Sequence, residues 1–182
     1  MPSPTIDSTI DAAPSDVPID PVSDAAIDAP PACPTSYTTT LSSTTSRYRV
    51  LATAAAFGTH HTACNGHLTG ATHLASLETA AEINELRGVL AALGANQYYV
   101  GVVQQPNSPT TTSNWFVLTG AQLPSGFFGN SNDDAPGENN EENLGALNTG
   151  DLLHDVTGDV AYPAVCECDG KAIDATVAGF IP

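Results

Sequence analysis

Basic residues are scarce in this chain, which has four lysines and arginines among 182 residues, against 20 acidic residues, and a formal net charge of -16. A surface this negative repels the phosphates of nucleic acids and of anionic membrane headgroups. Long apolar runs are also missing, and none approaches the roughly 18 residues that a membrane-spanning helix needs. We therefore expect neither a nucleic-acid partner nor a transmembrane segment in this chain.

Recognisable catalytic motifs are absent as well. Serine, histidine and aspartate all occur, but no serine lies in a Gly-x-Ser-x-Gly nucleophile turn, and no glycine-rich phosphate loop precedes a helix. The sequence therefore predicts a binding protein and not an enzyme.

The N-terminus, Met1-Pro2-Ser3-Pro4, has neither the basic start nor the apolar stretch of a secretory signal. The four cysteines are nevertheless better explained as two disulfides than as free thiols, and disulfides persist in oxidising compartments. We therefore expect that a signal has been removed and that the protein is secreted or displayed on the extracellular surface.

Residues 1–32 contain no aromatic and no basic side chain and are rich in proline, alanine, serine and recurring Ile-Asp pairs. Such a segment cannot bury enough apolar surface to offset an ordering cost of roughly 1–2 kcal/mol per residue. We predict a disordered acidic stalk over residues 1–32, one domain over residues 33–170 and a C-terminal tail over residues 171–182.

The rest of the chain contains both strand-like and helix-like segments. Polar and apolar residues alternate in the first strand-like segment, whereas apolar residues in the second helical segment recur at three- and four-residue steps before Gly94. The predicted elements are strands over residues 46–52, 98–103, 114–118 and 161–167 and helices over residues 57–68 and 77–93. These elements predict an α+β fold.

Residues 120–147 form a long segment of mostly glycine, asparagine, acidic residues and proline with little periodicity. A loop of this length is unusual in a compact domain unless it is functional. We therefore place the candidate binding surface in this segment.

The four cysteines restrict their own pairing. Cys166 and Cys168 lie two apart in a predicted strand, where their side chains share a face and their Cα atoms lie near the upper distance limit for a bridge. We expect that they do not pair with each other, and that one bonds Cys64 and the other Cys33. The alternative is a metal site at Cys166-Glu167-Cys168, although one residue between two thiolates is shorter than the usual structural zinc spacing.

A second metal hypothesis rests on His60, Cys64 and His67, which follow one another at helical-turn spacing. They would bind zinc or nickel only if Cys64 is not in a disulfide, and the alternative is a set of histidines on a helix surface. Trp115, the only tryptophan, is predicted to lie in the core and not to stack on a sugar.

The order of short motifs over residues 33–170 resembles the C-type lectin-like domain. The motifs that carry the resemblance are Cys33-Pro34, Tyr48-Arg49, Cys64, His73-Leu74-Ala75, Glu82, Tyr99-Val100-Gly101-Val102, Trp115-Phe116-Val117-Leu118-Thr119-Gly120, Glu142-Asn143, His154-Asp155 and Val165-Cys166-Glu167. The acidic stalk resembles those that precede such domains in exported bacterial proteins.

This resemblance implies a fold in which two helices flank a short antiparallel sheet and a second, loop-bearing sheet, closed by terminal disulfides. It also implies that Cys64 pairs with Cys166 and Cys33 with Cys168.

The sequence departs from the family at its inner disulfide and at its calcium site. Leu144 and Gly158 stand where the inner disulfide has cysteines, so we expect a less tethered loop. Pro136 matches the proline of the family's calcium-binding triplet, but its neighbours Ala135 and Gly137 offer no side-chain oxygen.

Glu142 and Asp155 keep the positions of two calcium ligands of the family, and we assign them as candidate metal ligands outside the core. His154 replaces an asparagine and is a poor ligand for a hard cation. Nearby acidic and amide side chains would rebuild the calcium site in altered register, or the segment is an ordinary solvated loop. The predicted ligand-binding residues are Asp133, Asp134, Glu138, Asn139, Asn140, Glu142, Asn143, His154 and Asp155.

We therefore predict an extracellular module that recognises a glycan, with calcium as the candidate cofactor at a degenerate site. The alternative is a calcium-independent adhesion or structural module that binds a cell-surface protein through the same surface.

Overall fold

The computed structural model describes residues 32–110, 113–124, 126–130 and 142–182. Its elements in chain order are β1 (Thr39–Thr40), β2 (Arg47–Ala55), α1 (Phe57–His67), β3 (Thr72–Leu74), α2 (Ala80–Ala91), β4 (Gln97–Gln104), β5 (Trp115–Val117), β6 (Phe128–Asn130), β7 (Leu144–Asn148), β8 (Leu153–Val156), β9 (Tyr162–Cys168) and α3 (Ala175–Ala178). Residues 1–31 lie outside the described residues, so the disordered stalk stays a prediction.

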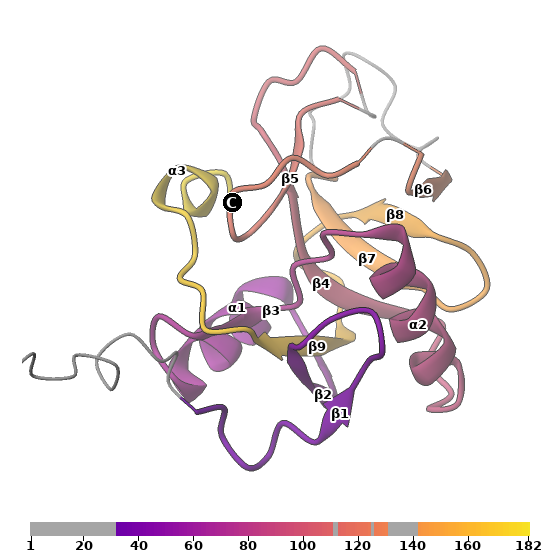
Figure 1. Cartoon of the computed structure of the whole chain (residues 1–182). Helices are drawn as coiled ribbons and strands as arrows, with labels where there is room; N and C mark the ends of the chain where they lie inside the picture. The colour runs from indigo at the N-terminus through magenta and orange to yellow at the C-terminus, as the bar shows by residue number, and fades with distance from the viewer. Residues whose placement is uncertain (1–31, 111–112, 125, 131–141) are drawn as a thin grey trace, which may run out of the picture.

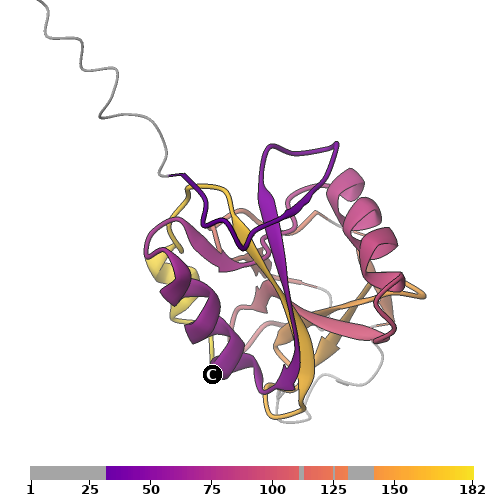
Figure 2. The same cartoon turned by 90° about the horizontal axis from the view of Figure 1, so that it is seen from below.

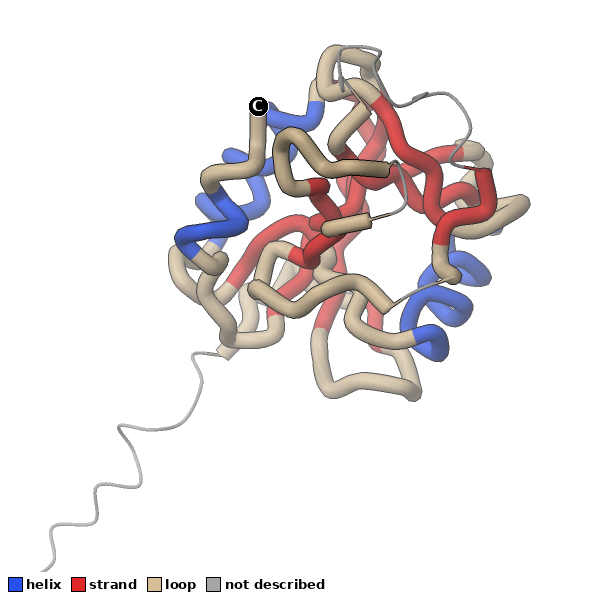
Figure 3. The backbone as a smooth tube through the Cα atoms, turned by 90° about the horizontal axis from the view of Figure 1, so that it is seen from above, coloured by secondary structure: helices blue, strands red, loops and turns tan. Residues whose placement is uncertain are grey.

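The strands lie between the two longer helices, with α1 on one side and α2 on the other (Figures 1 and 2). One antiparallel group contains β1, β2, β9 and β3, and a second contains β5, β4, β7 and β8, with β6 alongside β8. A parallel pairing of Tyr99 with Ala164 joins β4 to β9 and connects the groups into one sheet. Figure 3 shows the strands gathered between the helices. The predicted α+β fold is confirmed, and its two sheets are two parts of one connected sheet.

Strand β4 contributes side chains to both hydrophobic cores, because successive side chains of a strand point to opposite faces. Tyr98, Val100 and Val102 pack in the core that contains the apolar side chains of α2. Tyr99 and Val103 pack in the core that contains the buried side chains of α1. Residues 98–103 are therefore buried on both faces, which explains their uninterrupted apolar character.

Helix α2 is shorter than the prediction of residues 77–93. The side chain of Thr79 accepts a hydrogen bond from the Glu82 backbone N–H at 3.2 Å and caps the helix, so Leu77 enters the core before the helix begins. The helix ends at Ala91, and Leu93 beyond it is 55% exposed. The prediction from the spacing of apolar residues therefore extended the helix too far at both ends.

Trp115 is 2% exposed and packs against the ring of Phe128, with ring centroids 4.6 Å apart. The prediction that it belongs to the core is confirmed. A bound sugar has no open access to this indole face.

Both disulfides form as the resemblance implied. Cys64 on α1 bonds Cys166, and Cys33 bonds Cys168, with Cα atoms 5.4 and 5.8 Å apart respectively. The metal hypotheses that required thiolates at Cys166, Cys168 or Cys64 are therefore wrong. The two bridges attach β9 covalently to α1 and to the domain entrance.

Residues 171–182, predicted as a tail, include α3 and pack on the domain. Asp174 caps α3 through its side chain, and its backbone N–H donates to Leu118 at 2.8 Å. Val177 is 3% exposed and joins the core beneath α1. Figure 1 shows α3 at the end of the chain, on the same side of the molecule as α1 but well apart from it. Among the described residues, no helix has the length and apolar character required to cross a membrane.

Replacing Cys64 and Cys166 together with alanine is expected to lower the free energy of unfolding by about 2–5 kcal/mol, because the bridge closes a long loop. Urea denaturation would measure the loss, with the Cys33 and Cys168 double replacement for comparison. Recovery of Cys64 as a free thiol from the unreduced wild type would contradict the pairing.

Candidate functional site

The β7–β8 hairpin positions the predicted site residues that the structure describes. Gly145 pairs with Asp155 and Ala146 with His154 across the two strands, and Glu142 and Asn143 lie directly before β7. The start of β7 and the end of β8 are therefore adjacent. This arrangement brings Glu142, Asn143 and Asp155 to the same end of the hairpin.

Three oxygen atoms in this region are shielded from solvent: Oε2 of Glu142, Oδ1 of Asn143 and Oδ2 of Asp155. Carboxylate and amide oxygens are the donors that calcium prefers. Asp155 is only 8% exposed, because β8 is buried over most of its length, so the expectation that it lies outside the core is wrong. A substitution at Asp155 must therefore preserve its shape.

His154 does not converge with Asp155, because adjacent residues in a strand point to opposite faces. Its Nδ1 lies 3.3 Å from the Gln97 amide nitrogen, and its Nε2 lies 3.6 Å from an Asp151 carboxylate oxygen. These contacts direct the imidazole toward β4 and the β7–β8 turn. The role of His154 in ligand binding stays a prediction.

The remaining predicted ligand-binding residues lie outside the described residues. They are Asp133, Asp134, Glu138, Asn139 and Asn140, and Pro136 of the altered triplet lies there too. Their assignment therefore stays a prediction from the sequence.

The two positions of the missing inner disulfide lie against each other. A Cβ atom added to Gly158 would lie 2.9 Å from Cδ1 of Leu144, and Leu144 is fully buried. The leucine side chain thus occupies the space between the two backbones. An apolar contact stands at the two positions where the resemblance placed the cysteines of an inner disulfide.

A pocket of about 690 Å³ opens next to this contact. Its walls include Phe57 and Gly58 at the start of α1, Asn143, and the loop from Thr157 to Val160. The pocket combines apolar walls with an amide, a hydroxyl and a carboxylate. It therefore adjoins the predicted ligand-binding surface on the Asn143 side.

The histidines of α1 make structural contacts. His60 is 4% exposed, and its Nε2 lies 2.9 Å from the Tyr162 carbonyl oxygen. The Nδ1 of His67 lies 2.8 Å from the Tyr37 hydroxyl. With Cys64 in a disulfide, the predicted zinc or nickel set on this helix does not exist.

A buried polar network that the sequence analysis missed crosses three neighbouring strands. In the sheet, Glu167 of β9 pairs with Tyr48 of β2 on one side and with His73 of β3 on the other. The Tyr48 hydroxyl donates to Glu82 of α2 at 2.7 Å, and the Ser76 backbone N–H donates to Glu167 at 2.7 Å. Burial, and next the charge of Glu82, raise the pKa of Glu167 to about 7.

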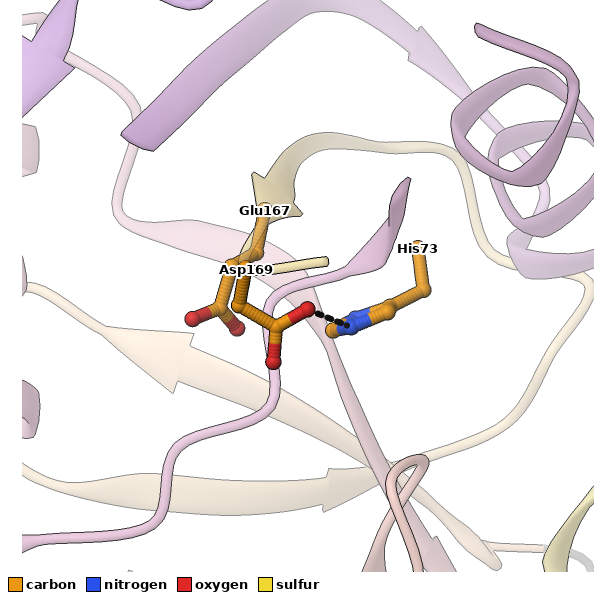
Figure 4. A group of neighbouring side chains, drawn as sticks. All are labelled: His73, Glu167 and Asp169. Carbon is orange, nitrogen blue, oxygen red and sulfur yellow. Dashed lines mark hydrogen bonds and ion pairs between the residues drawn. The ribbon is translucent and has the colours of Figure 1, made fainter. Parts of the chain in front are cut away.

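His73 and Asp169 form an ion pair at one end of this network, with Nε2 3.0 Å from Oδ1 (Figure 4). The His73 side chain is fully buried. Its burial lowers the pKa of His73, but the Asp169 hydrogen bond, the Glu167 charge and the Leu74 carbonyl outweigh it and raise the pKa overall. Asp169 is also desolvated, yet the bond and charge of His73 and the contacts with Lys171 leave its pKa lowered.

Within the described ranges, one group of three histidine, cysteine or acidic residues has all its ligand atoms within 4.8 Å of one another, namely His73, Glu167 and Asp169. Glu142, His154 and Asp155 do not form such a group. The sequence held one usable signal for the network: Glu167 and Asp169 alternate with the cysteines of the last strand and therefore share its other face. Their position opposite His73 depends on strand register, which the sequence does not specify.

No family model and no curated protein matches the chain. Among solved structures it is similar to the C-type lectin CEL-I from Cucumaria echinata, with 18% identity, a TM-score of 0.60, and coverage of 76% of this chain and 99% of that one. SPL-1 in its GlcNAc complex is 19% identical, with a TM-score of 0.59 and coverage of 75% and 95%. The mouse scavenger receptor C-type lectin carbohydrate-recognition domain is 17% identical, with a TM-score of 0.59 and coverage of 75% and 97%.

These similarities extend over nearly the whole length of the other chains and show that this protein has the C-type lectin-like fold. The fold implied by the order of sequence motifs is therefore confirmed.

The contact between Leu144 and Gly158 predicts that a disulfide can be restored there. In the double variant Leu144→Cys and Gly158→Cys, we expect the new thiols to oxidise and the melting temperature to rise, because the unfolded chain is further constrained. Thiol titration of the denatured protein and thermal unfolding would measure both effects. Two free thiols in an otherwise folded variant would show that the two backbones are not held in this register.

Proposed function

We propose that the protein is a binding module that recognises carbohydrate through the surface at the start of β7 and the end of β8. The observation that carries this proposal is the set of shielded oxygen atoms from Glu142, Asn143 and Asp155 on adjacent strand ends. The fold supports it, because structures with this fold include a GlcNAc complex and a carbohydrate-recognition domain. Asp133, Asp134, Glu138, Asn139 and Asn140 are the further ligand-binding residues of this proposal.

Calcium is the cofactor that this ligand set favours. The three oxygen donors are hard ligands, and the formal charge of the chain is -16, so a divalent cation would relieve repulsion between carboxylates. We assign Glu142 and Asp155 as the calcium ligands of the proposal. Sugar hydroxyl groups would complete the coordination of the ion.

A second candidate function is calcium-independent binding of a protein on a cell surface. The pocket beside Asn143 favours it, because Val160, which is 40% exposed, gives that pocket an apolar wall in addition to its polar rim. An apolar side chain of a partner would fit such a wall better than a saccharide would.

We further propose that the protein acts outside the cell and has no catalytic activity. Two disulfides with large sequence separations, 135 and 102 residues, support an oxidising compartment. The glycan or cell-surface partner of the proposal is accessible in that compartment.

A glycan array probed with the full chain is expected to give saturable binding to a defined class of saccharides in the presence of calcium. Binding should be lost with a chelator and return when calcium is added again. Equal binding with and without chelator would favour the calcium-independent module, and no saccharide binding in either condition would contradict glycan recognition.

Calcium at millimolar concentration is expected to raise the melting temperature, because it binds the folded state preferentially. The double variant Glu142→Gln and Asp155→Asn should remove this rise, since both substitutions preserve side-chain shape and delete carboxylate charge. Asp151→Asn is the matched control, because Asp151 lies in the same hairpin with a half-exposed side chain. The assignment of the calcium site is wrong if calcium raises the melting temperature of the double variant as much as it raises those of the control and the wild type.

A further inference from the structure

The tautomer of His73 is determined by its neighbours. Its Nδ1 lies 2.8 Å from the Leu74 carbonyl oxygen, which can only accept, so Nδ1 carries a hydrogen. In a neutral imidazole, Nε2 would then present a lone pair to the Asp169 carboxylate, whose Oδ1 lies 3.0 Å away. Two acceptors this close require a cation between them, which is either a proton on Nε2 or a metal ion.

The surroundings of this pair match those of metal ligands. Histidine ligands usually donate their second ring N–H to a carbonyl or carboxylate, as His73 does to Leu74. The carboxylates are held in the same way: the Lys171 backbone N–H donates to Asp169 at 2.8 Å, and the Ser76 backbone N–H donates to Glu167 at 2.7 Å. The side chains are thus oriented by groups that a bound ion would not displace.

The local charge also favours a cation. Four carboxylates belong to the network around β9, from Glu78, Glu82, Glu167 and Asp169. Two basic side chains contact them, Lys171 through Glu78 and Asp169 and His73 through Asp169. Three of these carboxylates, those of Glu82, Glu167 and Asp169, are shielded from solvent and repel one another strongly unless positive charge is added. A divalent ion would supply more charge than the single proton it replaces.

We propose that His73, Glu167 and Asp169 form a binding site for a divalent transition metal, with zinc as the ion that best matches one imidazole and two carboxylates. Zinc bonds to nitrogen and oxygen are about 2.0–2.2 Å long, so two ligand atoms on one tetrahedral ion lie roughly 3.3–3.5 Å apart, slightly more than the 3.0 Å between Nε2 and Oδ1 in this protein. Imidazole distinguishes this site from the oxygen-only calcium ligands at the hairpin.

Figure 4 shows how the third ligand would join. Glu167 lies near the end of β9 and Asp169 directly after it, and the Glu167 carboxylate lies beside that of Asp169. All ligand atoms lie within 4.8 Å of one another, so the Glu167 carboxylate would need to approach the other two by at most roughly 1.5 Å to share the ion. The site shares no residue with the proposed glycan surface and is independent of that proposal.

Isothermal titration calorimetry of the full, metal-stripped chain with zinc, magnesium and calcium in turn would test the proposal. We expect one zinc ion per chain, with His73→Gln and Asp169→Asn each weakening zinc affinity at least tenfold. His61→Gln is the matched control, because His61 is a neighbouring histidine outside the group, and it should bind zinc as the wild type does. Wild-type affinity in the His73 variant would overturn the proposal.

If the variants at His73 and Asp169 do not fold, nuclear magnetic resonance of the imidazole nitrogens of the wild type provides a second test. Among the five histidines, zinc should shift the Nε2 resonance of His73. Zinc-induced shifts confined to the other four histidines, or no shift at all, would overturn the assignment. The Glu142→Gln and Asp155→Asn double variant should bind zinc normally, which separates this site from the calcium hypothesis.

Discussion

The pairing of β9 with both β2 and β3 is the constraint on which the rest of the molecule depends. Residues 164–168 of this last strand pair with β2, and residues 166–168 also pair with β3 on the other side. The same strand touches β4 through Ala164 and carries both bridging cysteines at its end. Early and late parts of the chain are therefore held by hydrogen bonds and covalent bonds at one place.

This central strand has two chemically different faces. Cys166 and Cys168 face α1 and the domain entrance, where they form bridges, whereas Glu167 lies on the face that meets Tyr48, His73 and Glu82. Desolvating a carboxylate normally destabilises a fold, and burial raises the pKa of Glu167; hydrogen bonds from the Ser76 backbone N–H and the Tyr48 hydroxyl, and the charge of His73, offset part of that cost. The buried polar network thus links α2 to the sheet. The carboxylates of Glu82 and Glu167 each accept hydrogen bonds in place of those they would make to water.

The sequence predicted those features that depend on local pattern or on the order of motifs. The apolar run of β4, the helix that carries Cys64 and the exclusion of a Cys166 to Cys168 bridge all follow from residue spacing. The pairing of Cys33 with Cys168 came from the family resemblance, and the structure confirms it. Fold prediction succeeded because many motifs had to occur in one order.

Features set by long-range register could not be predicted in this way. Tyr48, His73 and Glu167 are distant in the sequence and meet only because three strands align. Burial of Asp155 also depends on how β8 packs and not on its own residue type. The four-residue helix α3 is too short to give a helical period, so the packing of its Val177 in the core had no sequence signal.

The Cys33 to Cys168 bridge has a mechanical consequence. Tension applied through the residues before Cys33 and after Cys168 passes directly across this covalent bond, because the bond closes a ring of chain with a sequence separation of 135 residues. The segments inside the ring carry no load, so stretching cannot peel β2 away from β9. Under a pulling force, the ring of chain between Cys33 and Cys168 adds nothing to the contour length, and the proposed binding surface inside it keeps its shape.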